Sequence, residues 1–336
     1  MSTTHAATAA NSAAARRSDA KPRLLACTTN DGTLCICFSI MNRRALLAWS
    51  LSALAGCPRG AFADTPASAD LTQHDLRLEG DPRIARRSLL LVPKPKPENP
   101  ALLVLLHGLG ETGNERLGIH AWGELYGLVK AYERLRRPPL RRTLERHQYF
   151  SEERQAELNQ ALAGDAFRGV VLACPVTPNP SRAGPGSLDR YADWIEKTLI
   201  PAVRERAGLG KNTKIGLDGC SLGGYVALEV FLRKPELFAT VGGVQAAFSV
   251  PAALRYADSV AKTLAKVGPR RLHIETSSSD PYRKANVTFS RKLRELGVEN
   301  DLVVPPGPHD QPWLREIGTL EMLLWHERAL RAKSSR

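Results

Sequence analysis

Apolar residues occur along the chain in short runs separated by longer amphipathic stretches. The run at residues 101–106 is uninterrupted, as expected of a parallel strand that is covered on both faces. Runs of similar length, bounded by turn residues, predict the other strands. The predicted strands are residues 74–79, 84–92, 101–106, 169–174, 214–217, 239–244, 271–276 and 301–304.

Stretches with apolar residues at helical spacing lie between several of these strands. The predicted helices are residues 122–135, 152–162, 189–206, 224–232 and 313–332. Pro201 lies inside the third of them and predicts a kink there, or an early end to the helix. Strands alternating with helices predict an α/β fold with a mostly parallel, doubly wound sheet, in a single domain at residues 64–336.

The connection after the third strand is much longer than a crossover between parallel strands requires. It separates residues 101–106 from residues 169–174 and predicts a helical insertion at about residues 112–166. Five arginines lie between its two helices: Arg136, Arg137, Arg141, Arg142 and Arg146. Two interpretations stay open. The insertion forms a lid beside a functional site, or it is a solvated helical pair packed away from that site.

The first 63 residues differ in pattern from the rest. Residues 1–40 read as a disordered or misassigned extension, with translation beginning at Met41. Residues 41–63 combine paired arginines, a short apolar run and a small-residue end, which is typical of an export signal of the twin-arginine type. The apolar run is too short to span a bilayer.

Two processing points compete within this signal. The sequence Leu-Ala-Gly-Cys ending at Cys57 resembles a lipobox, which would attach a lipid and hold the protein at a membrane. The sequence Ala-Phe-Ala ending at Ala63 resembles a cleavage site that would release it. Either one predicts an exported protein, and the alternative is a cytoplasmic protein with an apolar N-terminal helix.

The net charge of +13 has no nucleic-acid motif or aromatic-basic platform beside it, so no nucleic-acid partner is predicted. Cys174 and Cys220 are the cysteines that would remain after signal removal. A disulfide between them and a pair of buried thiols are both open. No metal-ligand spacing occurs, and we predict no metal and no cofactor.

The sequence Gly219-Cys220-Ser221-Leu222-Gly223 follows a predicted strand and precedes a predicted helix. A G-x-S-x-G pattern in that context is typical of a nucleophile elbow, where a sharp turn presents the serine hydroxyl above the sheet. The five-residue pattern alone is weak, because its glycines also suit an ordinary tight turn.

A serine hydroxyl needs a base, and His309 is the candidate. It follows the last predicted strand on a loop, whereas the other histidines lie in the N-terminal tail, within strands or helices, in the insertion or at the glycine loop. Asp280 follows the strand at residues 271–276 and would orient His309 and stabilise its protonated form. Glu275, within that strand, and Asp310, beside the histidine, are the competing acids.

The glycine loop after the third strand is the candidate for the oxyanion site. The backbone N–H of Leu222 would be one donor, and that of Leu109 the second. The glycines of the loop, Gly108 and Gly110, allow a close approach of backbone and substrate, and His107 supports the loop.

These residues, in this order, resemble the α/β-hydrolase superfamily from about residue 101 to the C-terminus. The sequences YADWIE at 191–196, SLGGY at 221–225 and GPHD at 307–310 resemble bacterial serine esterases of the esterase D, feruloyl/acetyl esterase and phospholipase/carboxylesterase kind. Two departures are the long insertion and Cys220. Dienelactone hydrolases carry a cysteine as nucleophile, but here that position is Ser221.

The sequence therefore predicts an exported serine hydrolase that cleaves a small or medium ester through an acyl-enzyme on Ser221. A thioesterase, a lipase or a peptidase would use the same three residues, and these readings stay open. The alternative from a different class is a catalytically silent binding protein that kept the fold. The sequence predicts no oligomeric state.

Overall fold

The computed structural model describes residues 68–332. The predicted extension at residues 1–40 and the predicted export signal at residues 41–63, with its lipidation candidate Cys57, lie outside the described residues. Among the helices of residues 68–332, none has both the length and the apolar character that crossing a membrane requires.

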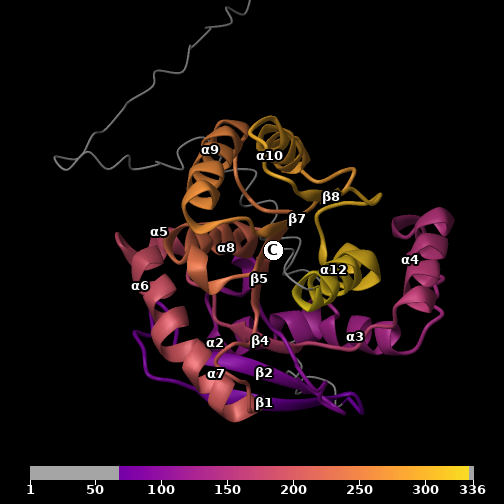
Figure 1. Ribbon diagram of the computed structural model, residues 1–336, viewed down its shortest axis with the longest axis horizontal. Coiled ribbons are helices and arrows are strands. Elements are labelled where there is room, and N and C mark those ends of the chain that lie inside the picture. The colour runs from indigo at the N-terminus through magenta and orange to yellow at the C-terminus, as the bar shows by residue number, and fades with distance from the viewer. Residues whose placement is uncertain (1–67, 333–336) are drawn as a thin grey trace, which may run out of the picture. The chain divides into compact units, whose positions relative to one another are not determined.

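Eight strands form one sheet (Figure 1). In chain order they are β1 (Leu71–Arg77), β2 (Arg87–Pro93), β3 (Leu102–Leu106), β4 (Val171–Pro175), β5 (Ile215–Gly219), β6 (Thr240–Val244), β7 (Arg271–Glu275) and β8 (Asp301–Val303). Their order in space is β1-β2-β4-β3-β5-β6-β7-β8. The β1–β2 and β2–β4 pairs are antiparallel, and all other pairs are parallel. The predicted mostly parallel sheet is confirmed, with strand ends shifted by a few residues.

The middle strands are buried along their whole length. Every residue of β3, β4 and β5 is buried, because helices cover both faces of the sheet. In β3 and β4 this burial matches an almost continuous apolar sequence. Strand β5 also carries Asp218, a charged side chain with no exposure to solvent.

The helices and helical turns follow the strands in alternation. They are η1 (Leu109–Glu111), α2 (Glu115–His120), η2 (Ala121–Leu125), α3 (Leu128–Arg136), η3 (His147–Tyr149), α4 (Glu152–Gly164), α5 (Pro180–Ala183), α6 (Ser187–Trp194), η4 (Ile195–Leu199), α7 (Ile200–Ala207), α8 (Leu222–Arg233), η5 (Pro235–Leu237), α9 (Val250–Val267), α10 (Arg283–Glu295), α11 (Gln311–Trp313), η6 (Leu314–Gly318) and α12 (Thr319–Arg331).

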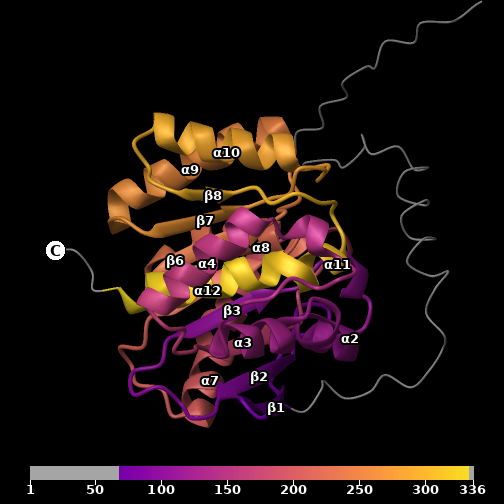
Figure 2. The same ribbon diagram turned by 90° about the vertical axis from the view of Figure 1, so that its right-hand side faces the viewer.

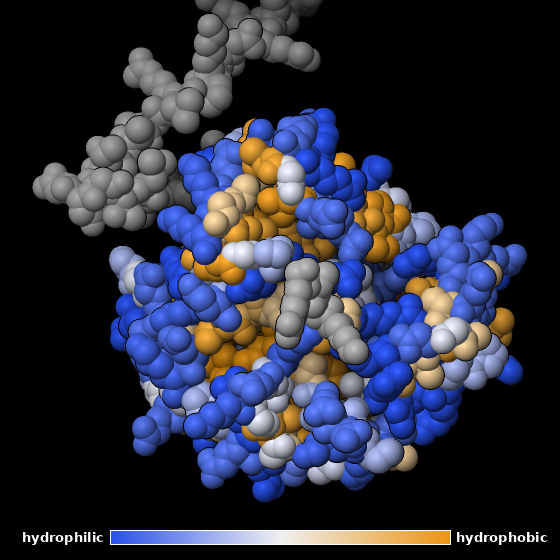
Figure 3. Space-filling view, viewed as in Figure 1, coloured by the Kyte–Doolittle hydropathy of each residue, from blue (hydrophilic) through white to orange (hydrophobic). Residues whose placement is uncertain are grey.

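The helices lie in two layers. Helices α3 and α12 lie on one face of the sheet, and α6 and α8 lie on the other (Figures 1 and 2). Hydrophilic residues cover the outer sides of these helices on the face seen in Figure 3, and hydrophobic residues gather toward its middle. This division is what amphipathic helices packed on a sheet produce.

The predicted helix at residues 189–206 is interrupted. The chain forms α6, then the π-helical turn η4, then α7, with Pro201 in the first turn of α7. Proline has no N–H for the bond that a continuous α-helix would need at that position, and a wider turn before it accommodates the loss.

Helices α9 and α10 were not among the predicted elements. Helix α9 begins after Ser249, whose hydroxyl accepts the N–H of Ala252, and it buries an apolar face that includes Val260 and Leu264. The N-cap serine and this spacing are the signals in the sequence that could have found it. Helices α9 and α10 pack against each other, side by side with the β7–β8 edge of the sheet (Figures 1 and 2).

The predicted insertion lies mainly over the α12 layer. Helix α3 packs on α12, and in α4 the guanidinium of Arg154 contacts the Glu321 carboxylate of α12 at 2.5 Å. The turn η3 approaches the loop of His309: a Cβ at Gly307 would lie 3.0 Å from the ring of Tyr149. Helices α3 and α4 of the insertion thus form a second layer on α12, while η3 lies beside the loop of the candidate base.

Cys174 and Cys220 do not lie on neighbouring strands, and of the two open interpretations the disulfide is wrong. Strand β3 pairs with both β4 and β5 and separates them. Both cysteines are buried free thiols. The chain passes from β4 to the far side of β3, so β4 and β5 follow each other in the sequence without being adjacent in the sheet.

Candidate functional site

Ser221 occupies a strained turn between β5 and α8. Its φ of 56° and ψ of −115° lie in a region that non-glycine residues rarely adopt. The flanking glycines are required by packing. A Cβ at Gly219 would lie 2.3 Å from the Gly223 backbone, and a Cβ at Gly223 would lie 2.1 Å from the carbonyl oxygen of Leu106. The turn therefore fixes the serine where the strand ends.

The glycine loop lies beside this turn. Strands β3 and β5 pair in register up to Leu106 and Gly219, and the Cys220 N–H bonds to the Leu106 carbonyl at 3.0 Å. The turn η1 begins at Leu109 and α8 begins at Leu222. An N–H at the start of a helix has no partner within that helix, so the N–H groups of Leu109 and Leu222 are suited to bind an oxyanion.

His107 is fully buried within this loop. Its Nε2 accepts the Thr177 N–H at 2.8 Å, so its Nδ1 carries the proton and donates to the Gly108 carbonyl at 2.9 Å. Burial lowers the pKa of His107 to about 4, and the ring is neutral at pH 7. Both ring nitrogens hold backbone groups of the loop or its neighbour, so His107 supports the loop.

Two further side chains hold the glycine loop and were missed from the sequence. The hydroxyl of Tyr126 accepts the Gly108 N–H at 3.0 Å and donates to the Glu111 carboxylate at 2.6 Å. Burial raises the pKa of Glu111, while the bond from Tyr126 works against that rise. No pattern in the sequence indicates this contact, because Tyr126 lies in the insertion and meets the loop only after folding.

Asp280 and His309 are brought together from loops after β7 and β8. The distance from Asp280 Oδ1 to His309 Nδ1 is 2.9 Å. The same carboxylate accepts the Tyr282 N–H at 2.9 Å and the Thr276 hydroxyl at 2.5 Å. A carboxylate with these donors is acceptor-only, so His309 carries its proton on Nδ1 and a lone pair on Nε2.

The competing acids face other partners. Asp310 accepts the Trp313 N–H at 2.8 Å and caps α11. Glu275 lies in β7, where its carboxylate is 3.6 Å from His273 Nε2, and burial raises its pKa well above the usual range. Of the three candidate acids, Asp280 is the one whose hydrogen bond to His309 is observed.

Gln245 connects the serine turn with the histidine loop, and no pattern in the sequence indicates this contact. It follows β6 with a φ of 52° and is fully buried. On its N-terminal side, the Val244 carbonyl accepts the Ser221 N–H at 2.9 Å. Its side-chain N–H donates to the Pro308 carbonyl at 2.9 Å and to the Ser277 hydroxyl at 2.8 Å. The backbone before His309 is thereby tied to the strand end beside Ser221.

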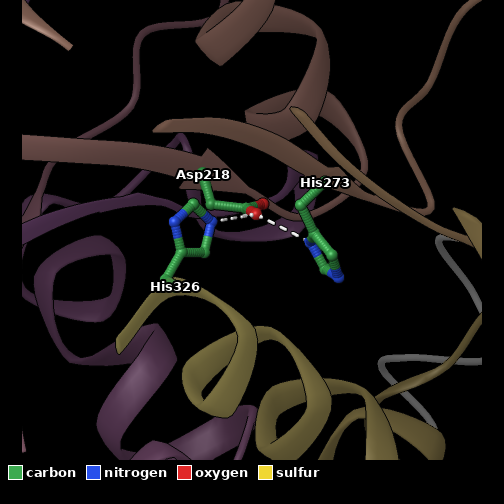
Figure 4. A group of neighbouring side chains, drawn as sticks. All are labelled: Asp218, His273 and His326. Atoms are coloured by element: carbon green, nitrogen blue, oxygen red, sulfur yellow. Dashed lines mark hydrogen bonds and ion pairs between the residues drawn. The ribbon is translucent and has the colours of Figure 1, made fainter. Parts of the chain in front are cut away.

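One group of buried side chains in residues 68–332 has the composition of a metal site. It comprises Asp218, His273 and His326, whose ligand atoms lie within 4.8 Å of one another (Figure 4). The prediction of no metal treated both histidines as ordinary residues of a strand and a helix. Asp218 lies 55 positions before His273 and 108 before His326, and only the packing of β5, β7 and α12 brings the three together.

No protein-family model and no curated protein matches the chain. Solved structures do match it. A ferulic acid esterase matches over 77% of this chain and 98% of its own length, with 15% identity and a TM-score of 0.54. An S-formylglutathione hydrolase from Staphylococcus aureus matches over 79% and 100%, with 16% identity and a TM-score of 0.53. Carboxyl esterase 2 from Tuber melanosporum matches over 85% and 97%, with 16% identity and a TM-score of 0.52. At such identities the likeness shows the fold.

Proposed function

We propose that this chain, which has the α/β-hydrolase fold, is a serine hydrolase that cleaves small or medium carboxylic esters. The observation that carries the proposal is the 2.9 Å hydrogen bond between Asp280 and His309. Both residues lie on loops at the carboxyl ends of parallel strands, as does the strained turn at Ser221. The names of two structural neighbours, a ferulic acid esterase and a carboxyl esterase, support the choice of an ester substrate.

In the proposed acylation, Ser221 Oγ attacks the ester carbonyl carbon while His309 Nε2 takes the hydroxyl proton. Asp280 keeps the imidazole oriented and stabilises its positive charge without accepting the proton. The N–H groups of Leu222 and Leu109 bind the oxyanion. When the tetrahedral intermediate collapses, the C–O bond breaks and His309 gives its proton to the leaving alcohol.

Deacylation repeats these steps with water in place of the serine. His309 takes a proton from the water, whose oxygen attacks the acyl carbon, and then returns a proton to Ser221 Oγ as the acid leaves. The residues in these roles require no cofactor. A thioester, a lipid ester or an activated amide would follow the same route, so the substrate class is decided by measurement.

Labelling with a fluorophosphonate probe followed by mapping of the adduct tests the assignment of the nucleophile. We expect the adduct on Ser221 and none on the Ser221→Ala variant. Hydrolysis of p-nitrophenyl acetate and butyrate tests the activity, and Ser221→Ala should abolish it. Wild-type turnover no faster than this variant across acyl chain lengths would favour the alternative, a catalytically silent binding protein.

We also propose that the enzyme is exported. The support is the sequence of residues 41–63, with a lipid on Cys57 as one outcome and cleavage after Ala63 as the other. Fractionation of the native host, with and without Cys57→Ser, separates them. A lipid-anchored protein leaves the membrane fraction when Cys57 is replaced by serine, whereas a cleaved protein is soluble in the wild type and in the variant. An intact N-terminus at Met1 on the native protein contradicts export.

A further inference from the structure

A second histidine–aspartate group lies in the core, beneath the serine turn. Asp218 comes from β5, His273 from β7 and His326 from α12, and none of the three side chains is exposed. Asp218 Oδ2 is 2.8 Å from His326 Nε2 and 3.2 Å from His273 Nδ1. Figure 4 shows both rings with a nitrogen turned toward this carboxylate. Two imidazole nitrogens and one carboxylate oxygen thus converge in a closed space.

Two glycines leave room for this group. A Cβ at Gly242, on the strand between Asp218 and His273, would lie 1.9 Å from Asp218 Oδ2. A Cβ at Gly216 would lie 3.1 Å from His326 Nδ1 and 2.6 Å from the Thr240 hydroxyl. Any other residue at either position would displace a polar side chain of the group.

The outer nitrogen of each histidine also faces a polar side chain. The distance from His326 Nδ1 to the Thr240 hydroxyl is 2.9 Å, and that from His273 Nε2 to the Glu275 carboxylate is 3.6 Å. Neither His273 Nε2 nor the two Glu275 oxygens has a hydrogen-bond partner within residues 68–332. Histidines that bind a metal are commonly held by a hydrogen bond on the far side of the ring, as His326 is by Thr240.

The buried carboxylate of Asp218 needs a compensating positive charge. Asp218 and Glu275 are both buried, and the ion pairs that each forms within residues 68–332 are with histidine, with no lysine or arginine among them. A buried carboxylate is costly unless a positive charge compensates it. A divalent cation bound by Asp218 and the two histidines would compensate the charge of the Asp218 carboxylate.

We propose that Asp218, His273 and His326 form a structural site for one divalent transition-metal ion, of which zinc is the expected one. Two imidazoles and a carboxylate suit zinc, and their complete burial excludes a substrate from the site. The chain supplies three ligands to the ion. The ion links β5, β7 and α12 and belongs to none of the steps at Ser221.

Metal analysis of the full chain, purified without a histidine tag, tests the proposal. We expect about one zinc per chain. Unfolding with a chelator and refolding without metal should remove the zinc and lower the Tm by about 5 °C. Refolding with Zn²⁺ should restore both the zinc content and the Tm. Refolding with Co²⁺ should give visible absorption bands from cobalt bound to nitrogen and oxygen.

Variants locate the ion. Asp218→Asn and His326→Gln should each retain less than about a tenth of the metal. The control is His74→Gln, which should retain all of it, because His74 lies on β1, the outermost strand on the far side of the sheet. The wild-type measurements decide the matter if the core variants do not fold. A metal-free wild type with an unchanged Tm and no uptake of Zn²⁺ or Co²⁺ overturns the proposal and leaves a network held by protons alone.

Discussion

Two aspartate–histidine groups occur within residues 68–332, one on the loops at the carboxyl ends of the parallel strands and one in the core. Asp280 and His309 lie on loops after β7 and β8, and the His309 side chain is 14% exposed. Asp218 and His326 lie in β5 and α12 with no exposure. In both groups an aspartate oxygen contacts an imidazole nitrogen at less than 3 Å. The chemistry of the pair is the same, and its surroundings differ.

The surroundings decide what each pair can do. Asp280 receives two further hydrogen bonds, so its charge is held independently of His309, whose ring reaches solvent. In the core, burial works to raise the pKa of Asp218, but the hydrogen bonds from His273 and His326 outweigh it and hold the pKa below its usual value. Both nitrogens of His326 face protein groups. In the proposed mechanism His309 passes a proton to the substrate, whereas the core pair holds β5, β7 and α12 together.

The largest expected effect follows removal of the loop histidine. His309→Ala should lower kcat/KM for p-nitrophenyl butyrate by about 10⁴- to 10⁶-fold, because Ser221 loses its base. The Tm should change by no more than about 3 °C, since the ring is partly exposed. His326→Ala should instead lower the free energy of unfolding by about 3–5 kcal/mol, because it leaves Asp218 with less compensation in the core. Steady-state kinetics and urea unfolding of both variants separate the two roles, and a destabilised His309→Ala with normal kcat would reverse the assignment.

The next effect concerns the acid. Asp280→Asn should lower kcat by about 10³- to 10⁴-fold, because the amide favours the wrong tautomer of His309. Asp310→Asn is the matched control. It retains an oxygen to cap α11 and should change kcat by less than about threefold. Equal losses in the two variants would mean that His309 takes its orientation from Asp310.

Much of the site around Ser221 could be predicted from the sequence because its parts follow strand ends. Ser221, Asp280 and His309 each lie on the turn or loop that follows a predicted strand, and parallel strands bring such positions to the same end of a sheet. The glycine loop at His107 follows the same rule. Local pattern and chain order were therefore enough to nominate these residues, although their roles remain predictions.

The core group could not be predicted in this way. Asp218, His273 and His326 meet because β6 alone separates β5 from β7 and α12 lies over all three strands. The local sequence pattern indicates neither the strand order nor the position of α12. A histidine inside a strand or a helix gives the same pattern whether or not it has a buried partner. The contacts of Gln245 and Tyr126 were missed for the same reason: they depend on which elements pack together.

A smaller effect is expected from the space that the core group needs. Gly242→Ala should lower the free energy of unfolding by about 3 kcal/mol, since its Cβ would lie 1.9 Å from Asp218 Oδ2. Gly243→Ala is the control on the same strand. Its Cβ would meet only Ala246 at 3.1 Å and the Gly224 backbone at 3.7 Å or more, so a loss of about 1 kcal/mol is expected. Urea unfolding measures both, and equal losses would show that the core group tolerates a methyl group.

The smallest effect concerns His107, which lies at the carboxyl end of β3 but is buried like the core group. Burial lowers its pKa from 6.5 to about 4, so on acidification the unfolded chain binds the proton before the folded chain does. The free energy of unfolding should therefore fall as the pH drops below about 6.5, until both states are protonated below about 4. His107→Gln removes this contribution, and between pH 7 and pH 5 the variant should lose about 2 kcal/mol less than the wild type. Urea unfolding of wild type and variant at both pH values measures this difference. The opposing contributions of Glu111 and Glu275 cancel in it because both proteins contain these residues. If wild type and variant lose the same free energy of unfolding between pH 7 and pH 5, His107 is solvated in the folded state. Its position at the carboxyl end of β3 would then determine its pKa more than burial does.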